Sequence, residues 1–187
     1  TVGNCSQLPV VRRGEMCRYN LLPLLVLCFL AAYSASLSAQ WIPNGIPVCI
    51  EQGTQTNIQI EEDGEGGMYV CWEDTRSLGG TDIYAQRINQ DGVILWQVGG
   101  IPICLAVNDQ VHPCMISDGS GGAIIAWQDK RNINEIFAQR VGPDGSVSWT
   151  ENGIQVSFGP YGQERPSIVS DGAGGAIIVW HDCLTGG

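Results

Sequence analysis

The residues best suited to chemistry are an aspartate and a basic residue that recur together. Asp74-Thr75-Arg76 and Asp129-Lys130-Arg131 each follow a short apolar run that ends in tryptophan. A carboxylate and a guanidinium two residues apart form an ion pair that fixes a loop, or they line a face that binds an acidic or sugar ligand. In the ligand interpretation, the face consists of Asp74, Arg76, Asp129, Lys130 and Arg131.

A second set of aspartates precedes glycine, at Asp63, Asp118 and Asp171. Repeated carboxylates suggest cation binding, but aspartate before glycine is typical of tight turns. A calcium loop requires several oxygen ligands close together, and these three residues are far apart in the sequence. We therefore interpret them as turn residues and predict neither a metal site nor a cofactor.

The sequence contains no recognisable catalytic set. Its two histidines, His112 and His181, occupy positions where the other copies of the repeat described below have different residues. The chain lacks a Gly-x-Ser-x-Gly elbow, a paired zinc motif and a phosphate-binding loop. Neighbouring carboxylates such as Glu61 and Glu62 point to opposite sides of a strand. The question of enzymatic activity is thus left open by the sequence.

These residues belong to an internal repeat. The Asp-Gly pairs that begin at 63, 118 and 171 are separated by 55 and 53 residues. Two tryptophan series keep the same steps: 72, 127 and 180, and 41, 96 and 149. Two independent markers in phase indicate a repeat architecture with a period of roughly fifty residues.

Each copy predicts four short antiparallel strands joined by glycine-rich turns. In the copy over 112–157 the strands are expected at 113–117, 123–127, 135–141 and 146–156, the last interrupted at Asn152-Gly153. In the copy over 58–104 they are expected at 58–60, 68–72, 82–88 and 93–103. Four strands in about fifty residues are the content of one β-propeller blade.

Stacking of such blades would bury the repeated tryptophans. Trp72, Trp127 and Trp180 each end an apolar run, so we interpret them as core residues between blades. A sugar-binding aromatic platform is the functional alternative.

The predicted fold is all-β, a partial β-propeller of about two and a half four-stranded antiparallel blades over residues 41–187. It consists of a lone fourth strand at 41–50, blades at 58–104 and 112–157, and a half blade at 165–187. Residues Trp41 to Cys49 parallel Trp96 to Cys104, which supports the lone strand. Propellers need about four or more blades, so we expect this chain to be an N-terminal fragment.

Residues 1–39 are predicted to precede the mature protein. Arg18, an apolar run over 21–32 and small residues up to Ala39 follow the order of a secretory signal peptide. Met16 is the expected start, with residues 1–15 as upstream reading frame. A membrane anchor is the alternative, and the polar residues from Ser34 disfavour it. The predicted location is secreted, periplasmic or at the cell surface.

Export would place five cysteines in an oxidising compartment. They are Cys49, Cys71, Cys104, Cys114 and Cys183. Cys104 and Cys114 flank the connection between two blades and are the candidate disulfide. Cys71 aligns with Ala126 and Val179, so a small buried thiol is its expected role.

Charge excludes some classes of partner. The chain has a formal net charge of -10, and most of its acidic residues lie after residue 39. Such a surface repels the phosphate backbone of nucleic acids and anionic membrane surfaces. We therefore expect no nucleic acid partner and no stable membrane insertion after signal cleavage.

The repeat resembles secreted bacterial β-propeller repeats of the broad TolB-like kind. The residues that carry the resemblance are Ser117-Asp118-Gly119, Trp127-x-Asp129-x-Arg131 and Asp82-Ile83-Tyr84. The resemblance covers residues 41–187 and implies a propeller, a fold that hosts both enzymes and binding modules.

Three functions fit these observations. The first is an exported propeller that acts as a binding or scaffold module, non-catalytic in this chain. Its expected partners are a protein or glycan ligand and the remaining blades of the same chain. The alternative is the propeller domain of a secreted hydrolase of glycans or peptides, with catalytic residues outside this chain. A structural surface-layer component is the third.

Overall fold

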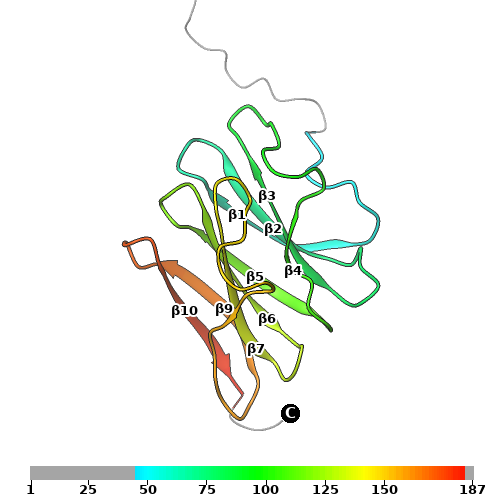
Figure 1. The fold of residues 1–187 in the computed structure, drawn as a ribbon, viewed down its shortest axis with the longest axis vertical. Coiled ribbons are helices and arrows are strands. Elements are labelled where there is room, and N and C mark those ends of the chain that lie inside the picture. Colours follow the sequence, from blue (N-terminus) through cyan, green and yellow to red (C-terminus); the bar gives the residue numbers. More distant parts are fainter. Residues whose placement is uncertain (1–44, 184–187) are drawn as a thin grey trace, which may run out of the picture. The chain divides into compact units, whose positions relative to one another are not determined.

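The computed structural model describes residues 45–183, which form an all-β structure without a helix. Sheet A has the strand order β1-β2-β3-β4, sheet B has the order β5-β6-β7-β8, and β9 and β10 form a hairpin (Figure 1). All pairs of neighbouring strands are antiparallel. The strands are β1 (Gln55–Glu62), β2 (Met68–Asp74), β3 (Asp82–Ile88), β4 (Ile101–Cys104), β5 (Gln110–Ser117), β6 (Ala123–Asp129), β7 (Glu135–Val141), β8 (Ile154–Gln155), β9 (Gln163–Ser170) and β10 (Ala176–Asp182).

The third strand of each sheet has the bounds that the sequence predicts, 82–88 and 135–141. The fourth strands are shorter than expected. Of the predicted fourth strands at 93–103 and 146–156, only the last parts form strands, as β4 and β8. The first parts form only the single bridges Ile88–Ile94 and Val141–Val147. The reason is a tight turn in each connection, closed by hydrogen bonds from the Gly100 amide to the Gln97 carbonyl and from the Gly153 amide to the Thr150 carbonyl.

The second strand of each sheet lies between two neighbours and is almost wholly buried. Every residue of β6 is buried, and so is every residue of β2 after Met68. A strand covered on both faces needs no polar alternation, which agrees with the apolar sequence over 123–127. β5 is an edge strand, and its register shifts between Val111 and Cys114, so Pro113 interrupts no central ladder.

Sheets A and B pack on one another through a shared core. Tyr69, Cys71 and Ile83 of sheet A belong to the same buried cluster as Met115 and Trp127 of sheet B. β5 contacts both β1 and β9, so the first strands of the two sheets and the hairpin lie side by side. The connected core follows from the apolar residues that recur on both faces of the repeat.

A second buried cluster lies on the other face of sheet A. Val70, Trp72 and Tyr84 form it with Ile88, and Val48 and Cys49 pack against them. The predicted lone strand at 41–50 begins outside the described residues, and residues 45–50 form no strand. Pro47 has no amide hydrogen to donate to a neighbouring strand. Residues 45–50 therefore contribute apolar contacts through Val48 and Cys49, and no strand pairing.

The repeated tryptophans differ in burial. Trp72 and Trp127 are buried in the cores, as predicted, whereas Trp180 is half-buried. Trp96 is also buried, and its indole Nε1 donates a hydrogen bond of 3.0 Å to the Pro143 carbonyl of sheet B. Trp149, the counterpart of Trp96, is half-buried.

The predicted signal peptide at 1–39 and the start at Met16 lie outside the described residues. Within residues 45–183, no helix is long and apolar enough to cross a membrane.

Gly153 allows a close approach of the backbone to the tryptophan of the central strand. Its φ is +85°, and an added Cβ would lie 2.5 Å from Cη2 of Trp127. Gly119→Ala is the matched control, because Gly119 has a φ of +70° and open space around its Cβ position. We expect the control to cost about 1–2 kcal/mol of unfolding free energy, and Gly153→Ala about 1–3 kcal/mol more. Urea unfolding measures both; equal losses would contradict the tight contact.

Candidate functional site

In sheet B the Trp-x-Asp-x-Arg segment forms a closed polar cluster at the end of β6. Oδ2 of Asp129 accepts hydrogen bonds from Nε1 of Trp127 at 2.9 Å and from Nη2 of Arg131 at 2.7 Å. Oδ1 of Asp129 accepts the Arg131 amide at 2.9 Å. The carboxylate is fully buried, and a buried charge with this many donors is a structural ion pair.

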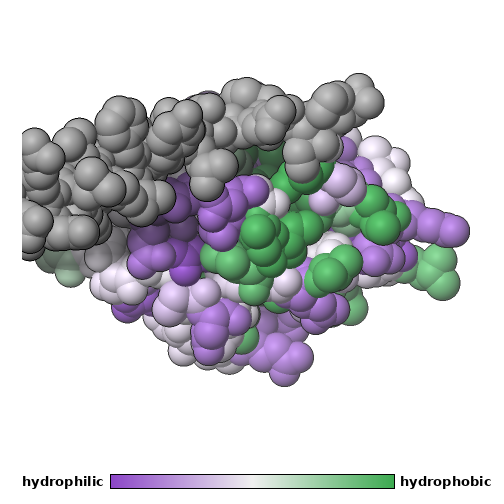
Figure 2. All heavy atoms as spheres, turned by 90° about the horizontal axis from the view of Figure 1, so that it is seen from above, coloured by the Kyte–Doolittle hydropathy of each residue, from purple (hydrophilic) through white to green (hydrophobic). Residues whose placement is uncertain are grey.

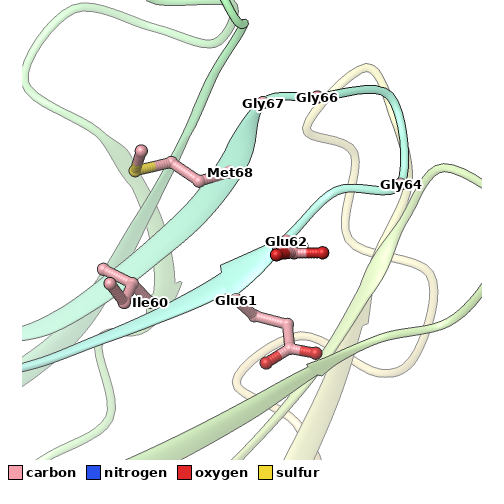
Figure 3. A pocket seen from close by; sticks show the side chains of 7 residues that line it. All are labelled: Ile60, Glu61, Glu62, Gly64, Gly66, Gly67 and Met68. Carbon is pink, nitrogen blue, oxygen red and sulfur yellow. The ribbon is translucent and has the colours of Figure 1, made fainter.

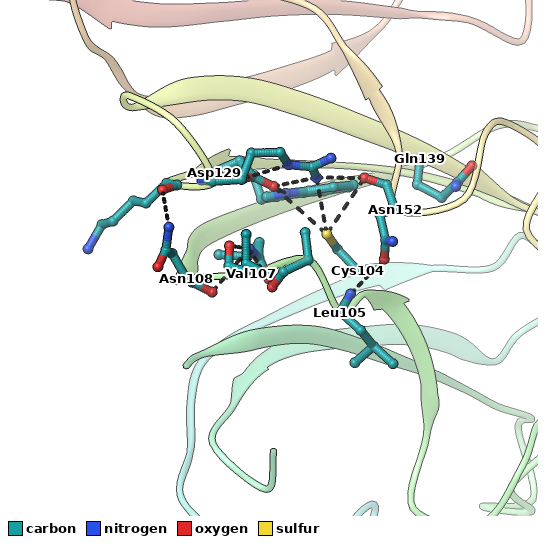
Figure 4. Close-up of polar contacts among 12 residues, drawn as sticks. Cys104, Leu105, Val107, Asn108, Asp129, Gln139 and Asn152 are labelled. Carbon is teal, nitrogen blue, oxygen red and sulfur yellow. Dashed lines mark hydrogen bonds and ion pairs between the residues drawn. The ribbon is translucent and has the colours of Figure 1, made fainter. Parts of the chain in front are cut away.

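The guanidinium of Arg131 connects this carboxylate to three other parts of the chain. Its Cζ lies 3.9 Å from the centroid of the Phe137 ring on β7. Nη2 donates to the carbonyl of Asn152 at 2.8 Å and contacts Sγ of Cys104 at 3.4 Å (Figure 4). One arginine therefore links the central strand, the third strand, the fourth-strand connection and the preceding sheet.

Sheet A repeats the arrangement. Oδ2 of Asp74 accepts hydrogen bonds from Nη2 of Arg76 at 2.6 Å and from the indole of the β2 tryptophan at 2.8 Å. Arg76 lies 3.9 Å over the Tyr84 ring and donates to the Gly99 carbonyl at 2.8 Å and to Sγ of Cys49 at 3.1 Å. Cys49 thus contacts Arg76 of sheet A as Cys104, on β4 of sheet A, contacts Arg131 of sheet B, although residues 45–50 form no strand.

These contacts shift the ionisation of the sheet A pair. Burial on its own would raise the pKa of Asp74, but the hydrogen bonds from Arg76 and Trp72 outweigh it and hold the pKa below its ordinary value. The hydrogen bond to Asp74 raises the pKa of Arg76. Both groups stay charged over the whole physiological range.

The five residues predicted as a ligand face serve different purposes. Asp74 is paired with Arg76 and Asp129 with Arg131, and both arginine side chains are largely buried. Lys130 is the exposed member of the set, and its Nζ lies 3.3 Å from Oδ2 of Asp109. The geometry fits the loop-fixing interpretation of these residues.

The aspartates before glycine organise the turns at the other end of the sheets. Oδ1 of Asp118 accepts the amides of Ser120 at 2.7 Å and Gly122 at 2.9 Å. Its Oδ2 accepts Nε of Arg140 on β7 at 2.9 Å. Asp63 makes the equivalent contacts in its turn and with Arg87. Among residues 45–183, no group of three His, Cys, Asp or Glu residues is arranged to hold a metal ion.

Sequence reasoning missed the glutamine and arginine of the third strands. Gln139 is fully buried; its Oε1 accepts the amides of Arg140 at 3.0 Å and Trp149 at 2.9 Å, and its Nε2 donates to the Thr150 carbonyl at 2.9 Å. Gln86 does the same in sheet A. The signal was available as the tripeptide Ala-Gln-Arg, which occurs at 85–87 and again at 138–140.

The predicted disulfide between Cys104 and Cys114 is not formed in the structure, where both are free thiols. Cys104 is buried beside Arg131, whereas Cys114 pairs with Ala126 across β5 and β6. Burial raises the pKa of both thiols to about 12. Cys71 is also buried, as expected.

The first strands bulge at equivalent positions. Asn57, His112 and Arg165 have φ values of 48°, 55° and 52°, and each lies where the register of its strand pair shifts. The preceding sheet captures the amide hydrogen of the next bulge: Oε1 of Glu73 accepts the His112 amide at 2.7 Å, and Oε1 of Gln128 accepts the Arg165 amide at 3.3 Å. The three bulge side chains are exposed.

These bulge positions are the candidate site. The bulge and its left-handed backbone recur in each copy, yet the exposed side chain is an amide, an imidazole and a guanidinium in turn. Asn57 and His112 lie near the same carboxylate, because Oε1 of Glu73 also accepts Nδ2 of Asn57 at 2.7 Å. Such groups bind polar ligands by hydrogen bonds. In the sequence, His112 is not predicted to be functional, because the other copies have different residues at this position. In the structure, that same difference between copies distinguishes the bulge positions from the surrounding residues.

Comparisons with protein-family models, curated proteins and solved structures found no match to this chain. The resemblance to TolB-like repeats therefore stays a prediction.

Loss of the buried carboxylate in sheet B should destabilise the fold strongly. Asp129→Ala leaves Arg131 and the Trp127 indole without their acceptor, so we expect a loss of about 3–5 kcal/mol in unfolding free energy. Lys130→Ala breaks the surface pair with Asp109, whose carboxylate keeps the Thr81 amide, and should cost no more than about 1 kcal/mol. Denaturant unfolding of both variants tests this; similar losses would contradict a structural role for the cluster.

Stability should fall in acid. Burial on its own would raise the pKa of Asp118. The hydrogen bonds from the Ser120 and Gly122 amides and from Arg140 outweigh burial, so the pKa lies below its ordinary value. The unfolded chain, with an aspartate pKa of about 3.9, therefore binds the proton first. The stabilisation of the fold by the ionised Asp118 carboxylate is therefore present above about pH 4 and is lost as the pH falls through the folded-state pKa.

Asp118→Asn keeps an acceptor for the turn and removes this titration. Between about pH 5 and pH 3, the unfolding free energy of the variant should depend less steeply on pH than that of the wild type. Asp91→Asn, in an exposed turn, changes the charge equally and is the control. If both variants keep the wild-type slope, the carboxylate of Asp118 is not linked to stability.

Proposed function

We propose that this chain is part of an exported β-propeller that acts as a binding or scaffold module. Sheet A, sheet B and hairpin β9–β10 would be successive blades. In support, the two sheets share their strand order and their Trp-Asp-Arg and glutamine contacts, and they pack face to face in one core. Export to the periplasm, the cell surface or the medium rests on the signal sequence predicted for residues 1–39.

The observation that carries the binding role is the row of bulges at Asn57, His112 and Arg165. A bulge redirects a side chain. A residue other than glycine in the left-handed region costs about 1–3 kcal/mol and is enriched at ligand-contacting positions. Three neighbouring strands keep this conformation with three different polar side chains. A protein or glycan ligand with several hydrogen-bonding groups fits such a surface.

A catalytic role has less support at these positions. Glu73, the carboxylate beside His112, already accepts hydrogen bonds from the His112 amide, from Asn57 and from the hydroxyl of Thr56. An acid or base needs a free proton position that faces the substrate. We therefore favour binding without chemistry.

The test is a screen of the full chain on glycan and peptide arrays, followed by titration of each hit. The variants are His112→Asn and Arg165→Asn, because asparagine tolerates the left-handed conformation and occupies the same position at Asn57. The double variant should weaken binding about tenfold or more.

Asp91→Asn is the control, because its turn joins β3 and β4 at the opposite end of sheet A, as the register of β2 and β3 requires. Control affinity should match the wild type. A screen without hits, or hits that the double variant binds equally well, would contradict the proposal.

A further inference from the structure

The loops at one end of the sheets form a continuous surface, which we call the loop end. In sheet A, Asp74 pairs with Asp82 and Ile83 pairs with Cys104, so the loops that follow β2 and β4 leave the sheet at the same end. Sheet B repeats this arrangement. The loop end consists of residues 75–81, 105–109, 130–134 and 156–162.

Backbone hydrogen bonds tie these loops to one another. The bonds from amide to carbonyl are Gln110 to Thr81 at 2.6 Å, Lys130 to Asp109 at 2.9 Å and Gln163 to Asn134 at 2.8 Å. A side-chain contact adds to them, because Nδ2 of Asn134 donates to Oε1 of Glu164 at 2.6 Å. The loops therefore present their side chains on one connected surface that spans both sheets and the hairpin.

Each of the four loops exposes at least one large apolar side chain. Phe158 is 80% exposed and Val107 is 70% exposed. Leu105 and Phe158 hold the same place in the repeat, since each follows its fourth-strand tryptophan, Trp96 or Trp149, by nine residues. The exposed apolar side chains of the loop end are Leu78, Leu105, Val107, Ile133, Phe158 and Tyr161.

This exposure does not depend on further blades. Leu105 and Val107 lie in the connection between sheets A and B, and Phe158 lies in the connection between sheet B and the hairpin, so the structure describes the neighbours on both sides. Figure 2, seen from the side of sheet A, shows apolar side chains exposed there as well. Those on the strands of sheet A are on a face that a further blade would cover, whereas the loop tips lie beyond the strand ends.

The opposite end of the sheets has a different character. Its turns consist largely of glycine and acidic residues, and Glu65, Asp91 and Asp144 are exposed there. Figure 3 shows the turn between β1 and β2, where Glu61 and Glu62 precede the glycines. The two ends of the molecule therefore differ: one presents carboxylates, and the other presents apolar side chains.

The row of bulges belongs to the loop end. Asn57, His112 and Arg165 each lie two residues after the first residue of β1, β5 and β9, the strands that begin at this end. Asn57 is exposed although sheet B follows it, and His112 is exposed although the hairpin follows it. The exposure of Arg165 at the same place is therefore a property of the bulge.

Arg165 differs from the other cations of the described chain. Within residues 45–183 it forms no ion pair, whereas each of the other lysines and arginines does: Arg76, Arg87, Lys130, Arg131 and Arg140. An arginine binds a carboxylate through two parallel hydrogen bonds. In a chain with a formal net charge of -10, this exposed guanidinium is the point that attracts an anionic group.

The loop tips indicate what carries that anionic group. Contiguous exposed apolar side chains with polar neighbours mark sites of protein–protein interaction. Four of the six loop-end side chains are aliphatic: Leu78, Leu105, Val107 and Ile133. Aliphatic side chains bury the apolar side chains of a peptide, but they offer no flat ring on which a sugar could stack.

We propose that the loop end binds a segment of another protein that carries apolar side chains and a carboxylate. The carboxylate binds Arg165, and the apolar side chains of the segment pack on the loop tips. This inference rests on the proposed binding function and narrows its ligand from a protein or glycan to an acidic, apolar peptide.

A peptide array tests the inference with the full chain. Its peptides vary leucine, isoleucine, valine and phenylalanine around one central position, and each is printed with glutamate and with glutamine there. The wild type should bind the glutamate peptides about tenfold more tightly, as a charge-assisted hydrogen bond predicts. Fluorescence anisotropy then gives the dissociation constants of the tightest pair.

Two variants separate the two parts of the contact. Arg165→Asn should weaken the glutamate peptide about tenfold and leave the glutamine peptide unchanged. Leu105→Ser combined with Val107→Ser should weaken both peptides about tenfold or more, since apolar burial is lost. Val93→Ser is the control, an exposed valine beside the turn at the opposite end, and should bind like the wild type. All four residues are exposed, so near-UV circular dichroism should stay native.

The outcomes distinguish this inference from the proposed function. Ligands found only on the glycan array, equal binding of glutamate and glutamine peptides, or loop variants that bind like the wild type would overturn the inference and leave the binding role intact. The absence of any ligand on both arrays would overturn both.

Discussion

The structure depends on one constraint: the carboxylate that ends each central strand is buried and must keep its charge partners. Removing a carboxylate from water costs several kcal/mol unless donors replace the water. Asp129 obtains them from an indole, a guanidinium and a backbone amide. Since the guanidinium is in turn held by a ring and a distant carbonyl, satisfying one charge fixes three segments of sheet B.

The same logic explains why the short fourth strands stay attached. β8 pairs with β7 at only two positions, Phe137 with Gln155 and Ala138 with Ile154. Side chains supply the missing ladder contacts, because Gln139 binds the Trp149 amide and the Thr150 carbonyl. Buried polar side chains whose hydrogen bonds are all satisfied specify a single backbone conformation. Here they hold in place a segment that forms little regular strand.

The sequence allowed good predictions where local patterns decide the structure. The bounds of β3 and β7 and the aspartate turns follow from alternation and glycine placement, and their structures agree. The fourth strands were overestimated, because Ser146 to Trp149 favour pairing locally, but only Val147 forms a bridge and the side chain of Gln139 binds the backbone of the residues that follow. Asp129 is the local partner of Arg131, but the contacts of Arg131 with Phe137 and Asn152 and the pairing of Arg140 with Asp118 join distant segments, so only tertiary packing selects them. The bulge at His112 depends on a carboxylate 39 residues earlier, which no local pattern reveals.

The left-handed conformation at Asn57, His112 and Arg165 restricts which residues evolution or an engineer could place there. Asparagine, aspartate, histidine and glycine adopt it most easily, so the accessible chemical alphabet is small and polar. Exchanges within that alphabet alter the solvent-facing group while the buried frame keeps its contacts. A combinatorial library confined to these three codons would sample new surface chemistries at little cost to folding.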